Sequence, residues 1–245
     1  MQTVGIFGGL GPLAGAHFYQ RVVEMSPATN DQEHIPVILI SDPSIPNRVA
    51  HLSGTGESPV PKLTEVCRRL VEAGAQVIVL PSSTTSIYLA QLQEATGVPV
   101  ISLIDAVTEA IAVAGYRQIG IMATTPTRTF GVYEDSFARA GITPIYPDAQ
   151  SENDIMEVIM AVKGSPPLNA RNGDILLTDF SRLGRSLREI ASRSWARGID
   201  SILLGCTELP VVFSSTERTS SFGTTVKVFS STDILASKVV QLAYE

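Results

Sequence analysis

The chain has 245 residues, of which 44% are hydrophobic and 17% are charged, with a formal net charge of −6. This composition is typical of a globular protein and excludes a disordered or fibrous one. The basic residues are scattered, which argues against nucleic acid and membrane surfaces as partners and favours small molecules. Because no apolar leader precedes the first strand and no apolar run approaches about 18 residues, we expect a cytoplasmic protein with two reduced cysteines.

Short aliphatic runs alternate with amphipathic stretches along the chain. The runs are continuously apolar, as in buried parallel strands, and cover residues 4–7, 37–40, 77–80, 100–102, 119–122, 142–145, 202–204 and 226–229. Helical patterns lie between most of them, from about residue 61 and then over roughly 86–95, 106–114, 130–140, 152–162, 179–196 and 232–243. The alternation predicts an α/β protein with doubly wound parallel sheets, Rossmann-like or flavodoxin-like.

Two stretches repeat one another in the same register. Residues 74–84 and 198–208 each begin with glycine, continue as an apolar strand and reach a small nucleophilic side chain, Ser82 in the first copy and Cys206 in the second. The strands at 4–7 and 119–122 also lead through a turn to an aromatic position in both copies. We therefore expect two α/β domains related by a pseudo-two-fold axis.

The expected domain boundaries follow from this repeat. The first domain comprises residues 1–103 plus 211–245, and the second comprises residues 104–210. The last strand and helix are expected to return and complete the first domain. The active site is then expected in the cleft between the two domains.

Small polar clusters directly follow the expected strands. They are Gly8-Gly9-Leu10-Gly11-Pro12, Asp42-Pro43, residues 81–86, residues 124–127 and Gly205-Cys206-Thr207-Glu208. Ligands of open parallel sheets bind beyond the carboxyl ends of the strands, where helix N-termini offer free N–H groups. Since a helix N-terminus also lowers the pKa of a nearby thiol, we expect the pKa of Cys206 to lie below the value of about 8.5 for free cysteine.

At these motifs the chain resembles the cofactor-independent aspartate/glutamate racemases over nearly its whole length. The matching motifs keep the family's order and spacing; they are Gly8 to Pro12, Ile45 to Arg48, Pro81 to Ser86, Thr124 with Thr127, Lys163 and Leu204 to Pro210. The resemblance implies catalysis without metal or pyridoxal phosphate, and a homodimer. It also implies two cysteines that flank the substrate α-carbon, one removing the proton and the other protonating the opposite face.

Cys206 matches the second of these cysteines, whereas Ser82 stands where the family has the first and Ser83 where it has asparagine. The resemblance implies that the second cysteine acts on the L-enantiomer, so Cys206 favours conversion from L to D. A serine hydroxyl has no comparable anion near pH 7 without another base. Ser82 is therefore expected to be the weaker counterpart, and a structural role as the cap of the following helix is an equal alternative.

The resemblance further implies an acidic amino acid as substrate. Arg48 and Lys163 occupy positions at which aspartate-selective members hold the side-chain carboxylate, and a guanidinium suits a carboxylate geometrically. The remaining substrate-binding positions are expected to be Ser83, Thr84, Thr124, Thr127 and Thr207, with close backbone approach at Gly11. The predicted reaction is the interconversion of L- and D-aspartate, with glutamate as the other candidate.

Two alternatives stay open at this point. One is a malonate-type decarboxylase in which Cys206 alone protonates the carbanion, and the other is a degenerate protein that binds an acidic amino acid without turnover. Structural roles are expected for Cys67, which lies on an apolar helical stripe, and for His17, His34 and His51, which lack metal-ligand spacing. The glycine loop lacks the spacing of a nucleotide-binding loop.

Overall fold

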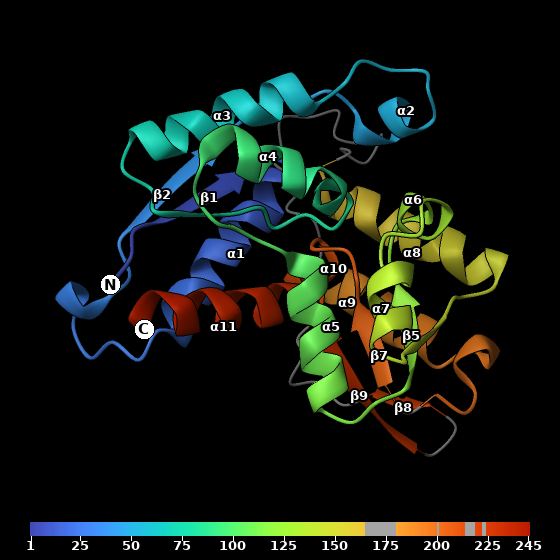
Figure 1. The fold of residues 1–245 in the computed structure, drawn as a ribbon. Helices are drawn as coiled ribbons and strands as arrows, with labels where there is room; N and C mark the ends of the chain where they lie inside the picture. Colours follow the sequence, from blue (N-terminus) through green and yellow to red (C-terminus); the bar gives the residue numbers. More distant parts are fainter. Residues whose placement is uncertain (165–179, 200, 214–218, 222–223) are drawn as a thin grey trace, which may run out of the picture.

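The computed structural model describes residues 1–164, 180–199, 201–213, 219–221 and 224–245, and contains two parallel sheets flanked by helices (Figure 1). The first sheet has the order β2-β1-β3-β4, from β1 (Val4–Gly8), β2 (Val37–Ser41), β3 (Val77–Val79) and β4 (Val100–Ile101). The second has the order β6-β5-β7-β9, from β5 (Gln118–Met122), β6 (Thr143–Ile145), β7 (Ser201–Leu204) and β9 (Thr224–Ser230), with a short antiparallel strand β8 (Thr219–Ser221) beside β9. The chain visits the four parallel strands in the same spatial order in both sheets, which confirms the predicted fold class.

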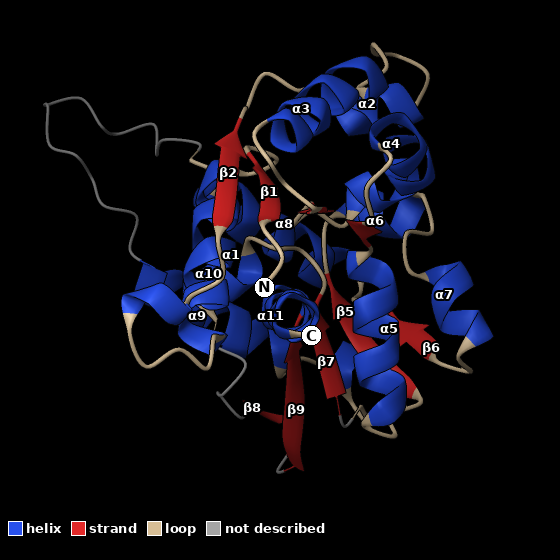
Figure 2. Ribbon diagram, turned by 60° about the vertical axis from the view of Figure 1, so that its left-hand side comes forward, coloured by secondary structure: helices blue, strands red, loops and turns tan. Residues whose placement is uncertain are grey.

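Helices cover the faces of the sheets (Figure 2). The first half carries α1 (Pro12–Met25), η1 (Asp31–Glu33), α2 (Arg48–Leu52), α3 (Val60–Glu72), η2 (Thr84–Tyr88) and α4 (Leu89–Thr96). The rest of the described chain carries α5 (Leu103–Val113), α6 (Thr125–Thr129), α7 (Glu134–Arg139), α8 (Ala149–Val162), α9 (Phe180–Ala191), η3 (Ser194–Ala196), α10 (Leu209–Val212) and α11 (Ser231–Tyr244). The helix predicted over roughly 179–196 corresponds to α9, which spans Phe180–Ala191. Residue 179 lies outside the described residues. Among the described residues, no helix combines the length and the apolar character needed to cross a bilayer.

The last strand differs from the sequence-based expectation. β9 pairs in parallel with β7, from Ser201 opposite Lys227 to Leu204 opposite Ser230, and so belongs to the second sheet. An apolar run of parallel-strand type suits the edge of either sheet, so its pattern does not tell which edge it joins. The expectation that this strand completes the first half is wrong, so residues 224–230 do not belong to the predicted first domain. The boundary after residue 103 stays a prediction.

One hydrophobic core is shared by the two halves. It includes Ile6 of β1, Phe18 of α1, Ile121 of β5 and Leu235 of α11, none of which exposes more than a trace of surface. α11 packs along α1 and against α5, as Figure 1 shows for the red helix between them. Burial of this shared apolar surface favours the joined arrangement of the two halves.

The predicted amphipathic helix after residue 60 is confirmed as α3. Its buried side chains, Leu63, Val66, Cys67 and Leu70, recur at the spacing of one helical face. Cys67 is completely buried in this face, and burial raises the pKa of its thiol to about 12. Cys67 is therefore a core residue, as the sequence predicts.

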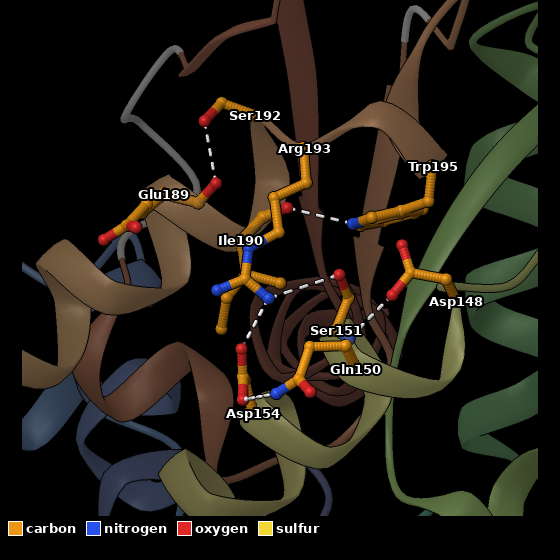
Figure 3. Close-up of polar contacts among 9 residues, drawn as sticks. All are labelled: Asp148, Gln150, Ser151, Asp154, Glu189, Ile190, Ser192, Arg193 and Trp195. Carbon is orange, nitrogen blue, oxygen red and sulfur yellow. Dashed lines mark hydrogen bonds and ion pairs between the residues drawn. The ribbon is translucent and has the colours of Figure 1, made fainter.

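A polar network joins α8 to the segment after α9 (Figure 3). Arg193 pairs with Asp154 and donates a hydrogen bond of 3.3 Å to the Ser151 hydroxyl, while Asp148 caps α8 by accepting from the Ser151 backbone N–H at 2.9 Å. Trp195 donates its indole N–H to the Ile190 carbonyl at 2.9 Å. These contacts fix the first turn of α8, and Lys163 directly follows the last residue of that helix.

Candidate active site

A cavity of about 370 Å³ lies at the carboxyl ends of the strands of both sheets. Nine of the ten predicted site residues line it, namely Arg48, Ser82, Ser83, Thr84, Thr124, Thr127, Lys163, Cys206 and Thr207. Its apolar lining includes Leu10, Ile45, Val49, Met156, Ile159 and Met160. The structure thus brings together, in one cavity, residues that lie more than a hundred positions apart in the sequence.

The two repeated loops are joined by a reciprocal pair of hydrogen bonds. The Ser83 hydroxyl donates to the Gly205 carbonyl at 2.6 Å, and the Thr207 hydroxyl donates to the Pro81 carbonyl at 3.1 Å. In the register of the repeat, Ser83 corresponds to Thr207 and Pro81 corresponds to Gly205, so exchanging the two halves converts one bond into the other. This exchange is what a pseudo-two-fold axis between the loops requires.

Ser82 and Cys206 are the middle residues of these joined loops, and each therefore reaches the cavity from a different half. Both are mostly buried, with exposed fractions of 5% and 8%. Among the described residues the Ser82 hydroxyl has no hydrogen-bond partner, and the cap position of η2 is taken by Ser83, without a side-chain bond. The alternative role of Ser82 as a helix cap is therefore not seen.

Tyr133 supports the junction of the two loops, and its role was not predicted from the sequence. Its hydroxyl donates to the Gly205 carbonyl at 3.1 Å and lies 3.4 Å from the Ser83 hydroxyl. Complete burial raises the pKa of Tyr133, so the hydroxyl remains a donor. The signal in the sequence was the repeat itself, in which an aromatic residue follows the first strand of each half.

Glu208 is the main site residue that sequence reasoning missed, although it lies within the motif that follows β7. One carboxylate oxygen, Oε2, accepts a hydrogen bond of 2.9 Å from the Cys206 thiol, and the other, Oε1, forms a short ion pair with the Lys163 ammonium group. Glu208 is only 2% exposed. The carboxylate therefore joins a predicted catalytic residue to a predicted substrate-binding residue.

Burial raises the pKa of Cys206 well above its usual range, and the neighbouring Glu208 carboxylate raises it further, with Lys163 opposing. The expectation of a lowered pKa at this thiol is wrong. The following helix, α10, has only four residues, so its dipole is small compared with burial and an adjacent negative charge. Cys206 is therefore a thiol that donates its proton to the Glu208 carboxylate.

Gly11 is the one predicted site residue that does not line the cavity. Its φ is +154°, and a Cβ atom at this position would collide with Glu208 Oε1. Gly11 therefore makes room for the Glu208 carboxylate, and it does not contact the cavity.

Arg48 begins α2, where Asn47 caps the helix through bonds from the Val49 and Ala50 backbone N–H groups. One guanidinium nitrogen donates to the Leu10 carbonyl at 3.4 Å, and the buried Nε has no partner among the described residues. Burial lowers the pKa of Arg48 and the Glu208 charge opposes that shift, but a guanidinium stays protonated. Arg48 therefore offers free donors to an anion in the cavity.

Two threonines complete the polar side of the cavity. Thr124 caps α6 by accepting from the Thr127 backbone N–H at 3.3 Å, and the two hydroxyls lie 2.8 Å apart. Among the described residues, no group of three or more His, Cys, Asp or Glu side chains is placed to hold a metal ion. The cavity thus offers one thiol, several hydroxyls, two cations and one carboxylate to a ligand.

Comparisons with known proteins identify relatives of this chain. The family model described as Asp/Glu/Hydantoin racemase matches residues 7–239. The aspartate racemase of Picrophilus torridus superposes with a TM-score of 0.82 at 24% identity, over 100% of this chain and 95% of that one. An uncharacterised protein of Pectobacterium carotovorum is 31% identical over 49% of this chain and 71% of its own length, and the glutamate racemase of Shewanella woodyi is 26% identical over 64% and 56%.

Proposed function

The chain belongs to the Asp/Glu/hydantoin racemase family, and from that premise we propose that it racemises aspartate, with glutamate as the other candidate, without a cofactor. The observation that carries the proposal is the reciprocal pair of loops, which supports a thiol and a hydroxyl in equivalent positions at one cavity. A two-sided proton transfer at the α-carbon needs such a pair. The free donors of Arg48 support a second carboxylate on the substrate.

The first step of the proposed reaction makes the base. The S–H bond of Cys206 breaks and an O–H bond forms on Glu208 Oε2, which lies 2.9 Å away and can accept the proton. The thiolate then removes the α-hydrogen of L-aspartate, forming a new S–H bond and leaving an electron pair on the α-carbon. Lys163, released from its ion pair with the now neutral Glu208, is free to hold a substrate carboxylate.

Reprotonation from the other face completes the reaction. Ser82 donates its hydroxyl proton to the α-carbon, directly or through a water molecule, and recovers a proton from solvent. Glu208 releases to solvent the proton that it took from Cys206, which restores the thiol beside a carboxylate. The hydroxyl groups of Thr84, Thr124 and Thr127 are proposed to hold the α-carboxylate. Those of Ser83 and Thr207, which donate their protons to carbonyl groups, are proposed to accept from the amino group. A serine is a much weaker base than a thiolate near pH 7, so the reverse abstraction, from D-aspartate, is slow on this face.

The experiment is solvent isotope exchange, followed by proton NMR in deuterated buffer from each enantiomer of aspartate separately. We expect L-aspartate to exchange its α-proton, with slow appearance of D-aspartate, while D-aspartate stays nearly inert on the same timescale. The overall equilibrium constant is unchanged, so the asymmetry is one of rates. Equal exchange from both enantiomers would contradict the role given to Ser82, and no exchange from either would favour a protein that only binds the amino acid.

A second candidate is decarboxylation of a substituted malonate. It is favoured by the single thiol at the cavity together with the apolar lining residues from α8, α2 and the loops after β1 and β2. In that reaction carbon dioxide leaves the substrate, and Cys206 protonates the resulting carbanion, which needs the thiol form. Release of carbon dioxide from phenylmalonate, with no exchange on aspartate, would identify this activity.

The proposal also includes the oligomeric state and the location of the protein. We propose that the protein works as a homodimer, and that it does so in the cytoplasm. Light scattering at micromolar concentration measures the first, with a mass of twice 26.2 kDa as the expected result.

A further inference from the structure

We infer that Glu208 selects the ligands of this cavity by their net charge, so that a dicarboxylate without an ammonium group binds more weakly than a dicarboxylic amino acid. The inference rests on the proposed function, because it names the charge of the substrate at the same site. It begins from an internal carboxylate that already occupies the space between a thiol and an ammonium group.

Four ionisable side chains line the cavity among the described residues: Arg48, Lys163, Cys206 and Glu208. With Cys206 as a thiol, two positive charges and one negative charge leave a net charge of +1. Moving the thiol proton to Glu208 relocates the negative charge to sulfur and leaves this sum unchanged. The charge of the cavity is therefore the same before and after the base is formed.

This single positive charge is complementary to one excess negative charge on the ligand. Aspartate and glutamate, with two carboxylates and one ammonium group, carry a net charge of −1. A dicarboxylate without the ammonium group carries −2 and leaves one negative charge uncompensated, and an amide such as asparagine carries no net charge and leaves one cation uncompensated. An uncompensated charge in a mostly buried cavity is costly, so both should bind more weakly.

The position of Glu208 makes it the residue on which this selection depends. Both of its oxygens contact groups of the cavity, and its exposed fraction of 2% leaves little water to screen its charge. Gly11 provides the space for the carboxylate, since any side chain there would collide with Oε1. A merely structural carboxylate would instead weaken every ligand alike when it is removed.

Three ligands of nearly equal size and different charge provide the test: asparagine (0), L-aspartate (−1) and L-malate (−2), each titrated calorimetrically into the full chain. The wild type should bind aspartate most tightly of the three. Glu208→Gln raises the cavity charge to +2 and should improve malate relative to aspartate by about tenfold or more. Lys163→Gln lowers the charge to 0 and should improve asparagine relative to aspartate.

Glu152→Gln is the matched control. It removes one carboxylate from the same helix that precedes Lys163, where Glu152 pairs with Arg128 at 3.0 Å outside the cavity, and the ligand order should not change. If a folded Glu208→Gln protein has the same ratio of malate affinity to aspartate affinity as the wild type, the inference is overturned. The proposed function still stands in that case, provided that aspartate binds. If Glu208→Gln does not fold, Lys163→Gln decides alone, and an unchanged preference there overturns the inference. If the wild type binds none of the three ligands, the proposed function fails together with it.

Discussion

The loops after β3 and β7 are equivalent in backbone position and in the hydrogen bonds that join them, but they differ in chemistry. Ser82 in the first corresponds to Cys206 in the second, and Thr84 corresponds to Glu208. Cys206 has a carboxylate partner at 2.9 Å, whereas the Ser82 hydroxyl has none among the described residues. The difference shows that the backbone of a two-sided site can be kept while the acid–base side chains lie on one side.

The largest expected effect comes from removing the Cys206 thiol. Cys206→Ala should reduce α-proton exchange of L-aspartate by about 10² to 10⁴-fold, the usual contribution of a positioned base, while leaving the fold intact. Proton NMR in deuterated buffer measures the exchange, and circular dichroism reports the fold. Cys67→Ser is the control, because this buried core thiol does not line the cavity and its loss should lower stability at most. Full activity of Cys206→Ala would remove the mechanism.

The next effect comes from making the two loops more alike. Ser82→Cys places a thiol on both sides, and exchange from D-aspartate should rise by about 10²-fold, far more than exchange from L-aspartate. The measurement is the ratio of initial exchange rates from the two enantiomers. Ser82→Ala is the matched variant, since it should slow the appearance of D-aspartate without creating a base. An equal gain from both enantiomers in Ser82→Cys would argue against the assignment of faces.

A smaller effect concerns the titration of Cys206. Burial and the Glu208 carboxylate raise its pKa, so the fraction of thiolate should grow only at alkaline pH. In the Cys67→Ser background Cys206 is the only cysteine of the chain, and the pH dependence of its alkylation by iodoacetamide gives the midpoint directly. We expect a midpoint above the value of about 8.5 for free cysteine. A midpoint at or below that value would mean that the cations of the cavity outweigh burial.

The smallest effects test the reciprocal hydrogen bonds themselves. Thr207→Val removes the only donor that the buried Pro81 carbonyl has among the described residues, and should cost about 2 kcal/mol of unfolding free energy. Ser83→Ala should cost less, about 1 kcal/mol, because Tyr133 still donates to the Gly205 carbonyl at 3.1 Å. Urea denaturation of the two variants measures the difference. In the background of Tyr133→Phe the cost of Ser83→Ala should rise toward that of Thr207→Val.

Much of the fold and most of the cavity lining were predictable because they depend on local patterns. Apolar runs of strand length, the spacing of residues 63, 66, 67 and 70 on α3, and the register between residues 74–84 and 198–208 are all visible in one dimension. The loops that follow parallel strands meet at one edge for topological reasons. The residues of these loops could therefore be assigned to one cavity, whereas Arg48 and Lys163 were assigned to it only through the resemblance to the family.

The sequence-based predictions that were wrong or missing concern contacts between distant segments. The pKa of Cys206 depends on burial and on the rotamer of Glu208, whose second partner, Lys163, lies 45 residues away and follows a different helix. The role of Tyr133 depends on a carbonyl 72 residues further along the chain. The strand β9 has the composition of a buried parallel strand, and only the free edge of the second sheet decides its place.

The reciprocal hydrogen bonds between the loops have a consequence for how the two loops can differ in sequence. Each bond crosses from one half to the other, so two identical half-length chains in a symmetric dimer would make both bonds from a single kind of loop. Once the halves are covalently joined, symmetry no longer forces both loops to mutate together, and a change on one side is not copied on the other. A single chain can therefore carry cysteine and glutamate in one loop and serine and threonine in the other, which a dimer of identical half-chains could not do.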